Sequence, residues 1–232
     1  MTTKSFFFMT FDSALSSLKQ GEFVMIHDSD GRENEIDMVA AAEFVTPEHI
    51  VRMRKHAGGL LCLAIDNSLA EKLQLKYMHN MLSASNELDE ESKKMIMGTA
   101  PYGDHPTFSI SINHKQTYTG ITDRDRALTI KEMSTLYKNE NPKQYFNSTF
   151  KTPGHVPLLI ASNGLLSSRT GHTEMSVYLA QLANLSPITA ICEMMDSETY
   201  SALSVEKAEK YAKENAIPFI DGKELLEFSK VN

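Results

Sequence analysis

The chain has 232 residues, of which 41% are hydrophobic, so it is long enough to bury a core as one domain or two small ones. The formal net charge is -7 and no lysine- and arginine-rich block occurs, which disfavours binding to nucleic acid. The apolar run near the N-terminus is too short to span a membrane, and Cys62 and Cys192 form no Cys-x-x-Cys pair. We expect a soluble cytoplasmic protein without a disulfide framework or a thiolate zinc site.

Helix and strand signals alternate along most of the chain. Helix starts are indicated by capping residues or by proline in the first turn, as at Asp12, at Thr46 with Pro47, and at Thr122 or Asp123. Strands are indicated by short apolar runs between turn residues. The predicted elements are helix 12–20, strands 22–27 and 38–44, helix 46–58, strands 60–65 and 107–112, helix 122–137, strand 156–162, helix 173–183, strand 187–192, helix 205–216, strand 218–220 and a helix from 223. A polar surface excursion is expected over residues 83–95. This order predicts a layered α/β or α+β fold of one unit, residues 1–232, with helices covering a sheet.

The acidic stretch HDSDGRENEIDM, residues 27–38, lies between two predicted strands. In an extended backbone Glu33, Glu35 and Asp37 would project from one face. Three carboxylates at that spacing suit a hard cation such as Mg²⁺. The alternative, which spacing alone favours, is a solvated acidic loop.

A second polar stretch, SSRTGHTE, precedes an apolar helical pattern. Thr173 is predicted to be the N-cap of that helix. Arg169, Thr170 and Gly171 then form a loop at the positive end of the helix dipole, which is suited to bind phosphate, and His172 beside it can ligate a metal. The alternative is an ordinary turn with a solvated histidine.

Five further residues could carry chemistry. His155 lies between two prolines in TPGHVP, which would hold it as a general acid or base, although a lone loop histidine is more often structural. Glu193 follows an apolar strand, where ligands often bind in α/β sheets. Asp125 and Arg126 form either a local ion pair at a helix start or a substrate contact. Cys62 is more simply a small core residue than a nucleophile.

Taken together, DGRENEIDM, TGITDRDR, PGHV, RTGHTE and the late CE occur in an order that resembles the 3,4-dihydroxy-2-butanone 4-phosphate synthase family of riboflavin biosynthesis. The similarity extends over residues 11–226. The resemblance implies a lyase that converts D-ribulose 5-phosphate to formate and 3,4-dihydroxy-2-butanone 4-phosphate. It also implies a three-layer α/β/α fold with a mixed sheet, and a homodimer with its sites at or near the interface.

The resemblance assigns roles to individual positions. It implies that Glu33 and His172 bind Mg²⁺, or Mn²⁺ in its place, with two ions per site. The implied catalytic residues are His155, Glu193, Asp28, Glu35 and Cys62. The implied substrate-binding residues are Arg32, Glu33, Asp37, Thr99, Asp125, Arg126, Arg169, Thr170, Gly171, His172 and Thr173.

The chain departs from the family pattern at a few positions. Ile36 stands where the family commonly has glycine, and Met97 replaces a histidine in a segment with about four extra residues. These substitutions make a non-catalytic sugar-phosphate binder the main rival to the enzyme. A second rival is a nucleotide- or RNA-binding protein with the fold of the threonylcarbamoyl-adenylate synthases, against which the acidic loop argues.

Overall fold

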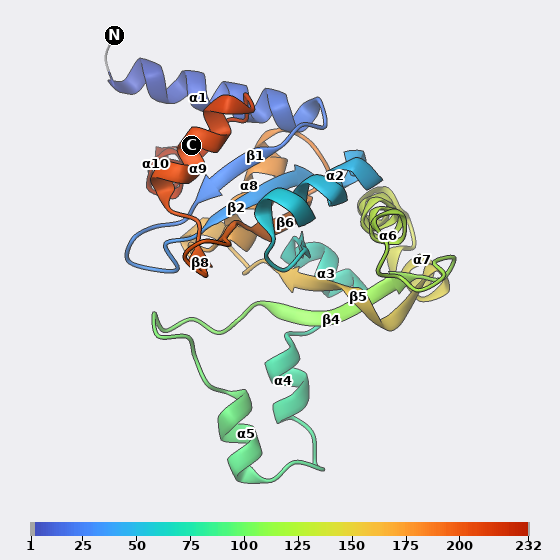
Figure 1. The fold of residues 1–232 in the computed structure, drawn as a ribbon. Helices are drawn as coiled ribbons and strands as arrows, with labels where there is room; N and C mark the ends of the chain where they lie inside the picture. The colour runs from blue at the N-terminus through green and yellow to red at the C-terminus, as the bar shows by residue number, and fades with distance from the viewer. Residues whose placement is uncertain (1–2, 232) are drawn as a thin grey trace.

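The computed structural model describes residues 3–231 and contains, within them, a seven-stranded mixed sheet (Figure 1). The spatial order is β4-β5-β3-β6-β2-β1-β9. β3 pairs with β5, and β1 with β9, in parallel, and the other neighbours are antiparallel. The strands are β1 (Val24–His27), β2 (Ile36–Ala41), β3 (Cys62–Ile65), β4 (Phe108–His114), β5 (Phe150–Ile160), β6 (Ile188–Glu193) and β9 (Phe219–Asp221). A separate ribbon pairs β7 (Met195–Asp196) with β8 (Ser201–Ala202).

Helices cover both faces of this sheet. The α-helices are α1 (Thr3–Lys19), α2 (Pro47–Arg52), α3 (Asn67–Leu73), α4 (Met78–Ser83), α5 (Glu90–Ile96), α6 (Asp123–Thr135), α7 (Pro142–Thr149), α8 (His172–Leu182), α9 (Val205–Glu214) and α10 (Gly222–Val231). Short turns of other helix types are η1 (Ala42–Phe44), η2 (Met53–Ala57), η3 (Leu136–Lys138) and η4 (Leu165–Ser167). Within the described residues no helix is long and apolar enough to cross a bilayer.

Two apolar cores, one on each face of the sheet, confirm the three-layer α/β/α prediction. Successive strand residues alternate between the cores: Met25 and Met38 face one, and Ile26 and Val39 face the other. The first core is closed by side chains of α2, α3, α6, α7 and α9. The second is closed by those of α1, α8 and α10. The same alternation decides which polar residues can reach α8.

The excursion after β3 is an exposed helical hairpin rather than an irregular loop. α4 and α5 extend away from the β4 side of the sheet (Figure 1). Asp89 caps α5 by accepting a hydrogen bond from the Ser92 N–H at 2.7 Å. After α5 the chain returns to the sheet through residues 98–107.

Several local expectations are wrong. Asp12 does not cap the first helix, because α1 already begins at Thr3. The N-cap of α8 is Gly171 and not Thr173, whose hydroxyl instead contacts that of Thr107 at 3.1 Å. The strand predicted from residue 38 begins at Ile36 and ends at Ala41, before η1.

Two predicted site segments also differ from expectation. Residues 30–33 form a turn, and Asn34 has a left-handed φ of 54°, so the acidic stretch is not extended before Ile36. TPGHVP is not a loop, because it lies within β5, where the Gly154 N–H donates to Ser111 Oγ of β4.

Candidate active site

The site lies at the edge where β1 and β6 end and β2 and β3 begin. Asp37 of β2 is in register with Glu193 of β6, and Cys62 of β3 is in register with Ile191, two residues earlier on β6. Alternation places Asp37, Glu193 and Cys62 on the α8 side of the sheet. Ile36, on the opposite side, is fully buried in the other core, so this departure from the expected pattern is a core residue.

Asp28 organises the acidic loop. Its carboxylate is buried and accepts hydrogen bonds from the backbone N–H groups of Glu33 at 2.9 Å and Glu35 at 3.1 Å. Arg32 Nη1 also lies 3.2 Å from it. These bonds fold the loop so that the Glu33 side chain turns towards α8. Asp28 therefore holds the loop in shape, and both of its oxygens are already engaged.

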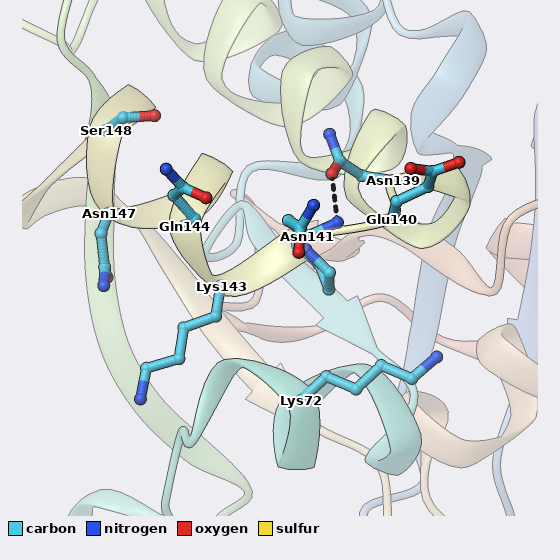
Figure 2. Close-up of a pocket in the computed structure, with 9 residues that line it drawn as sticks. Lys72, Asn139, Glu140, Asn141, Lys143, Gln144, Asn147 and Ser148 are labelled. Carbon is cyan, nitrogen blue, oxygen red and sulfur yellow. Dashed lines mark hydrogen bonds between the residues drawn. The ribbon is translucent and has the colours of Figure 1, made fainter.

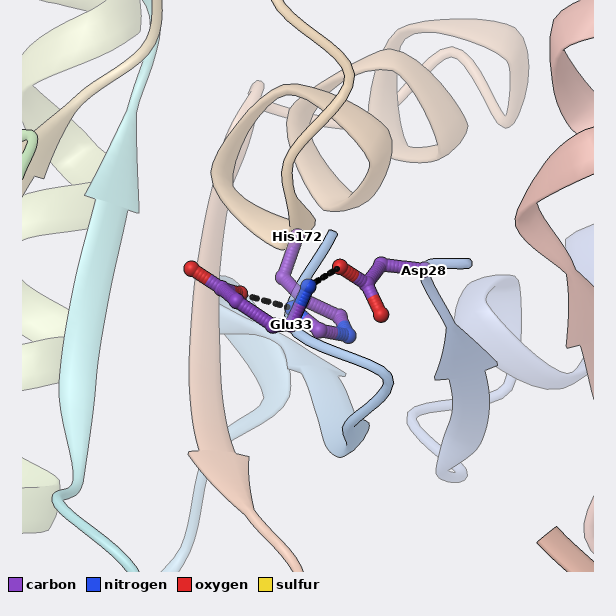
Figure 3. A group of neighbouring side chains, drawn as sticks. All are labelled: Asp28, Glu33 and His172. Carbon is purple, nitrogen blue, oxygen red and sulfur yellow. Dashed lines mark hydrogen bonds and ion pairs between the residues drawn. The ribbon is translucent and has the colours of Figure 1, made fainter. Parts of the chain in front are cut away.

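Glu33 and His172 face each other at the start of α8 (Figure 3). His172 Nδ1 lies 3.2 Å from Glu33 Oε2, while its Nε2 lies 3.2 Å from the Glu35 carbonyl oxygen. A carbonyl can only accept, so Nε2 carries a proton, and Nδ1 and Oε2 need a proton or a cation between them. Together with Asp28 they offer one ligand atom each within 4.8 Å of one another. This donor set fits Mg²⁺ or Mn²⁺.

The charges of this cluster are strongly coupled. Burial opposes charge on His172, but the nearby carboxylates of Asp37, Glu33 and Asp28 outweigh it and raise its pKa to about 9. Burial would raise the pKa of Glu33, yet hydrogen bonds from His172 and Tyr102 and the charge of Arg32 hold it well below its usual range. The field that favours a proton on His172 also favours a bound cation.

Two other carboxyl groups have raised pKa values. Burial raises the pKa of Asp37 to about 7 against the opposing pull of His172, and Asp37 Oδ1 is buried with no hydrogen-bond partner among the described residues. Burial and the charges of Glu33 and Glu193 raise the pKa of Glu35. Burial and Glu193 also raise the pKa of the Cys62 thiol, which therefore stays protonated.

Two guanidinium groups lie beside the first turn of α8. Arg169 Nη1 lies 2.6 Å from the fully buried carboxylate of Glu174. Arg32 Nη1 lies 2.8 Å from Glu33 Oε2. A Cβ on Gly171 would lie 2.2 Å from Arg169 Nη1 and 2.9 Å from Arg32 Nη2, so glycine is what lets both groups approach the helix start. Thr173 is buried beside them, and Thr170 is half-buried in the loop.

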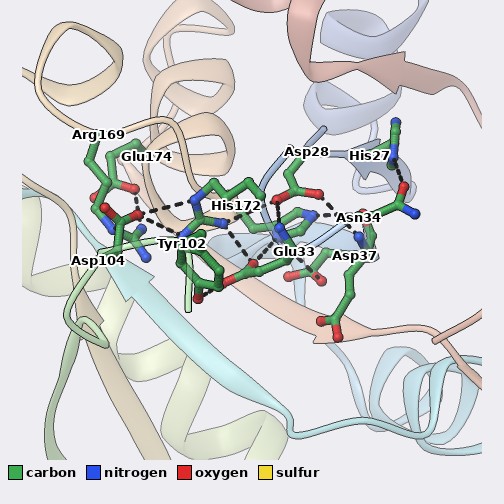
Figure 4. A network of polar contacts seen from close by, with 12 residues as sticks. His27, Asp28, Glu33, Asn34, Asp37, Tyr102, Asp104, Arg169, His172 and Glu174 are labelled. Atoms are coloured by element: carbon green, nitrogen blue, oxygen red, sulfur yellow. Dashed lines mark hydrogen bonds and ion pairs between the residues drawn. The ribbon is translucent and has the colours of Figure 1, made fainter. Parts of the chain in front are cut away.

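Tyr102 and Asp104 also belong to this network, and sequence reasoning missed both (Figure 4). The Tyr102 hydroxyl donates to Glu33 Oε1 at 2.6 Å, and the Arg32 guanidinium lies 4.8 Å from the centre of its ring. Asp104 Oδ2 lies 3.2 Å from Arg32 Nη2 and 3.3 Å from Arg169 Nε. Their only sequence signal is a place in the segment with extra residues.

Four predicted site residues lie outside this network. Thr99 is exposed in the loop after α5. His155 is exposed on β5, and its Nδ1 lies 3.0 Å from Asn113 Nδ2. Asp125 accepts from the Gly120 N–H at 2.9 Å. Arg126 pairs with Asp123 at 3.1 Å, so the expected ion pair between Asp125 and Arg126 is wrong.

The cluster opens into a cavity of about 200 Å³. It is lined by Glu33, Asp37, Cys62, Tyr102, Pro106, Thr107, Phe108, Leu159, Arg169, His172, Thr173, Ile191 and Glu193. A larger hollow of about 880 Å³ lies between α3 and α7, where Lys72, Lys143 and several amides project (Figure 2). The smaller cavity is the one lined by Glu33 and His172 of the candidate metal-binding group and by the buried Asp37, so the chemistry belongs there.

Comparison with known proteins identifies the family of the chain. The family model of 3,4-dihydroxy-2-butanone 4-phosphate synthase matches residues 12–228. The enzyme of that name from Methanothermobacter thermautotrophicus is 43% identical, covering 92% of this chain and 93% of its own, and that from Archaeoglobus fulgidus is 42% identical, covering 94% and 93%. A solved structure of such an enzyme in complex with two magnesium ions superposes with a TM-score of 0.79 at 26% identity, covering 95% of this chain and 96% of its own. The chain therefore belongs to the 3,4-dihydroxy-2-butanone 4-phosphate synthase family, whose members act in riboflavin biosynthesis.

Proposed function

We propose that the chain cleaves D-ribulose 5-phosphate to formate and 3,4-dihydroxy-2-butanone 4-phosphate with the help of a divalent cation. The observation that carries this proposal is the contact between Glu33 and His172, which are 139 residues apart in the chain, beside the buried carboxyl group of Asp37. A cation on Glu33 and His172 would stabilise negative charge developing on the substrate's ketone oxygen. We further propose two ions per site, Mg²⁺ or Mn²⁺, since a related enzyme has been solved with two magnesium ions.

The substrate phosphate would bind at the start of α8. Arg32 and Arg169 supply positive charge there, and the first turn of the helix supplies free N–H groups. The carbon chain of the sugar would then extend into the cavity towards Glu193.

The first chemical step removes a proton from the carbon next to the ketone. Asp37 is our candidate base, because it lines the cavity and one of its oxygens has no hydrogen-bond partner among the described residues. Glu35 is the alternative, whereas Asp28 is a poor base because both of its oxygens already accept hydrogen bonds. Glu193 and His155 would serve the later proton transfers, and the protonated Cys62 thiol would line the cavity wall.

We also propose that the enzyme is a homodimer in which His155 of one copy completes the site of the other. His155 is bound to Asn113, against which Gly120 packs. Tyr118 and Ile121, on either side of Gly120, are 96% and 51% exposed, which would suit burial against a second copy. Mixing the inactive variants Glu33→Gln and His155→Ala should then restore activity, because one site of each mixed dimer is intact. Absence of restored activity would contradict the shared site.

The reaction itself can be followed by proton NMR. Ribulose 5-phosphate with Mg²⁺ should release formate, and EDTA should stop the release. Glu33→Gln and His172→Ala should each abolish turnover and Mg²⁺ binding while circular dichroism stays unchanged. Absence of formate with every divalent metal would refute the enzyme and favour a sugar-phosphate binder.

The order of proton transfers has its own test. In deuterium oxide, wild-type enzyme should exchange the substrate's proton next to the ketone. Asp37→Asn should lose both exchange and formate release. Glu193→Gln should lose formate release and keep the exchange. Exchange that persists in Asp37→Asn would move the first step to Glu35.

A further inference from the structure

Residues 100–104 form a small closed loop at the mouth of the site. The Gly103 N–H donates to the Ala100 carbonyl at 2.9 Å, and the Ala100 N–H donates to the Asp104 carbonyl at 2.9 Å. Gly103 has a left-handed φ of 95° and no neighbour within 4 Å of its Cβ position. Because its backbone bonds are internal, this loop can shift as a unit without breaking the sheet.

The side chain of Asp104 lies between the two guanidinium groups. A single oxygen, Oδ2, accepts a hydrogen bond from Arg32 Nε at 3.2 Å, and it also lies 3.2 Å from Arg32 Nη2 and 3.3 Å from Arg169 Nε. Each arginine is held elsewhere by its Nη1, Arg32 on Asp28 and Glu33 and Arg169 on Glu174. The positions of the cations therefore do not depend on Asp104.

Asp104 satisfies these donors incompletely. Arg32 Nη2 and Arg169 Nε are buried, and neither has a hydrogen-bond partner among the described residues. Water cannot readily replace the partner at Arg32, because its side chain is only 8% exposed. Oδ2 of Asp104 accepts the hydrogen bond of Arg32 Nε, and it aligns with neither Arg32 Nη2 nor Arg169 Nε. A phosphate group, with three acceptor oxygens in a tetrahedral arrangement, can align with both.

We propose that the Asp104 carboxylate occupies the position between Arg32 and Arg169 at which the substrate phosphate binds. The phosphate must therefore displace Asp104 when it binds. This inference rests on the proposed function, which places the substrate phosphate at these arginines. When substrate is absent, the Asp104 carboxylate lies against the sides of the two guanidinium groups that Asp28, Glu33 and Glu174 do not contact. This arrangement makes phosphate compete with a tethered carboxylate, which lowers the affinity of the site for other small anions.

The same loop touches the metal site. Tyr102, two residues before Asp104, donates its hydroxyl to Glu33 Oε1 at 2.6 Å. When phosphate displaces Asp104, Tyr102 shifts with the loop and releases that oxygen. Phosphate binding and cation binding at Glu33 should therefore strengthen each other.

The test is the affinity of inorganic phosphate, measured by calorimetry in Mg²⁺ buffer for wild type and Asp104→Asn. If Asp104 occupies the arginines about nine-tenths of the time, its removal should tighten phosphate binding about tenfold. Glu91→Gln is the matched control, since it removes one charge from exposed helix α5 and should leave the affinity unchanged. Phosphate should also speed amide hydrogen exchange over residues 100–104 of the wild-type protein.

Equal or weaker phosphate binding by Asp104→Asn, including no binding by either protein, would overturn the proposal. Formate release by the wild type separates this failure from failure of the proposed function. If the wild type releases formate and Asp104→Asn binds phosphate with the same affinity as the wild type, only the proposed role of Asp104 is wrong. Tighter phosphate binding by Asp104→Asn without formate in any variant supports the competition and removes the proposed reaction.

Discussion

Replacing Gly59 with alanine should displace Glu193 and remove most of the activity while the sheet stays folded. Gly59 follows the left-handed turn at Gly58, and its N–H donates to the Glu193 carbonyl at 3.0 Å. An alanine methyl would lie 2.6 Å from both that carbonyl oxygen and Glu193 Oε2. The next N–H, that of Leu60, donates to the same Oε2 at 2.7 Å. The Leu60 N–H therefore holds the Glu193 carboxylate in place, and the absence of a side chain at Gly59 leaves room for it.

The size of the effect follows from these contacts. Because one clash is with a backbone oxygen, rotating the Glu193 side chain does not relieve it. Overpacking of this kind costs ~1–3 kcal/mol, and the charge-assisted bond to Leu60 is worth ~1.5–3 kcal/mol. Glu193 is half-buried, so we expect a loss near the lower end, ~2–3 kcal/mol, or ~4–12 °C in Tm. Loss of a positioned acid or base should lower kcat ~100-fold or more.

The assay is formate release together with urea denaturation. Gly31→Ala is the matched control, because Gly31 lies in the acidic loop with no neighbour within 4 Å of its Cβ position, and it should behave as wild type. Adding Gly59→Ala to Glu193→Gln should lower kcat little further, since both changes act through one carboxylate. A Gly59→Ala variant that is less stable but keeps wild-type kcat would refute the reasoning.

Two further predictions concern stability. Because the Ile36 side chain is fully buried, Ile36→Ala should lower the free energy of unfolding by ~2–5 kcal/mol and Ile36→Val by ~0.5–1.5 kcal/mol. Urea denaturation in EDTA measures both changes. An alanine variant as stable as the valine variant would contradict this prediction. Hydrogen bonds from Lys207 and the Glu198 N–H lower the pKa of Asp196 to about 2, so their contribution is complete above the usual aspartate pKa near ~4 and is lost as pH falls towards 2. The stability difference between wild type and Lys207→Met should therefore be constant near neutral pH and shrink below pH ~4, and a difference that persists in acid would argue against the pairing.

The sheet was largely predictable because its strands are short apolar runs. Such runs predict β1, β3 and β6, whose residues are buried on both faces of the sheet. The start of α1 was missed because the prediction rested on Asp12 as the capping residue, and Asp12 lies inside the helix. The acidic stretch was misread as extended although Asp30-Gly31 is a common turn dipeptide and Asn34 readily adopts a left-handed φ.

The site was predictable in parts and not as an assembly. Each half suggested its own chemistry, a cation near Glu33 and a phosphate near Arg169. Glu33 and His172 are 139 residues apart, and no local pattern shows that they meet, because the order of strands in the sheet decides this contact. Its prediction therefore depended on the family resemblance. Tyr102 and Asp104 were missed because they lie in a segment without periodicity or motif.

The pairing of Asp37 with Glu193 limits where the chain can change length. Side chains alternate along a strand, so deleting one residue between Ile36 and Ala41 would turn Asp37 into the apolar core and bring Ile36 or Met38 to the site. By contrast, the hairpin of α4 and α5 leaves the sheet after α3 and rejoins it only at β4. Insertions there lengthen the excursion without shifting any strand. Length variation among relatives should therefore concentrate between α3 and β4 and be rare within β2 and β6.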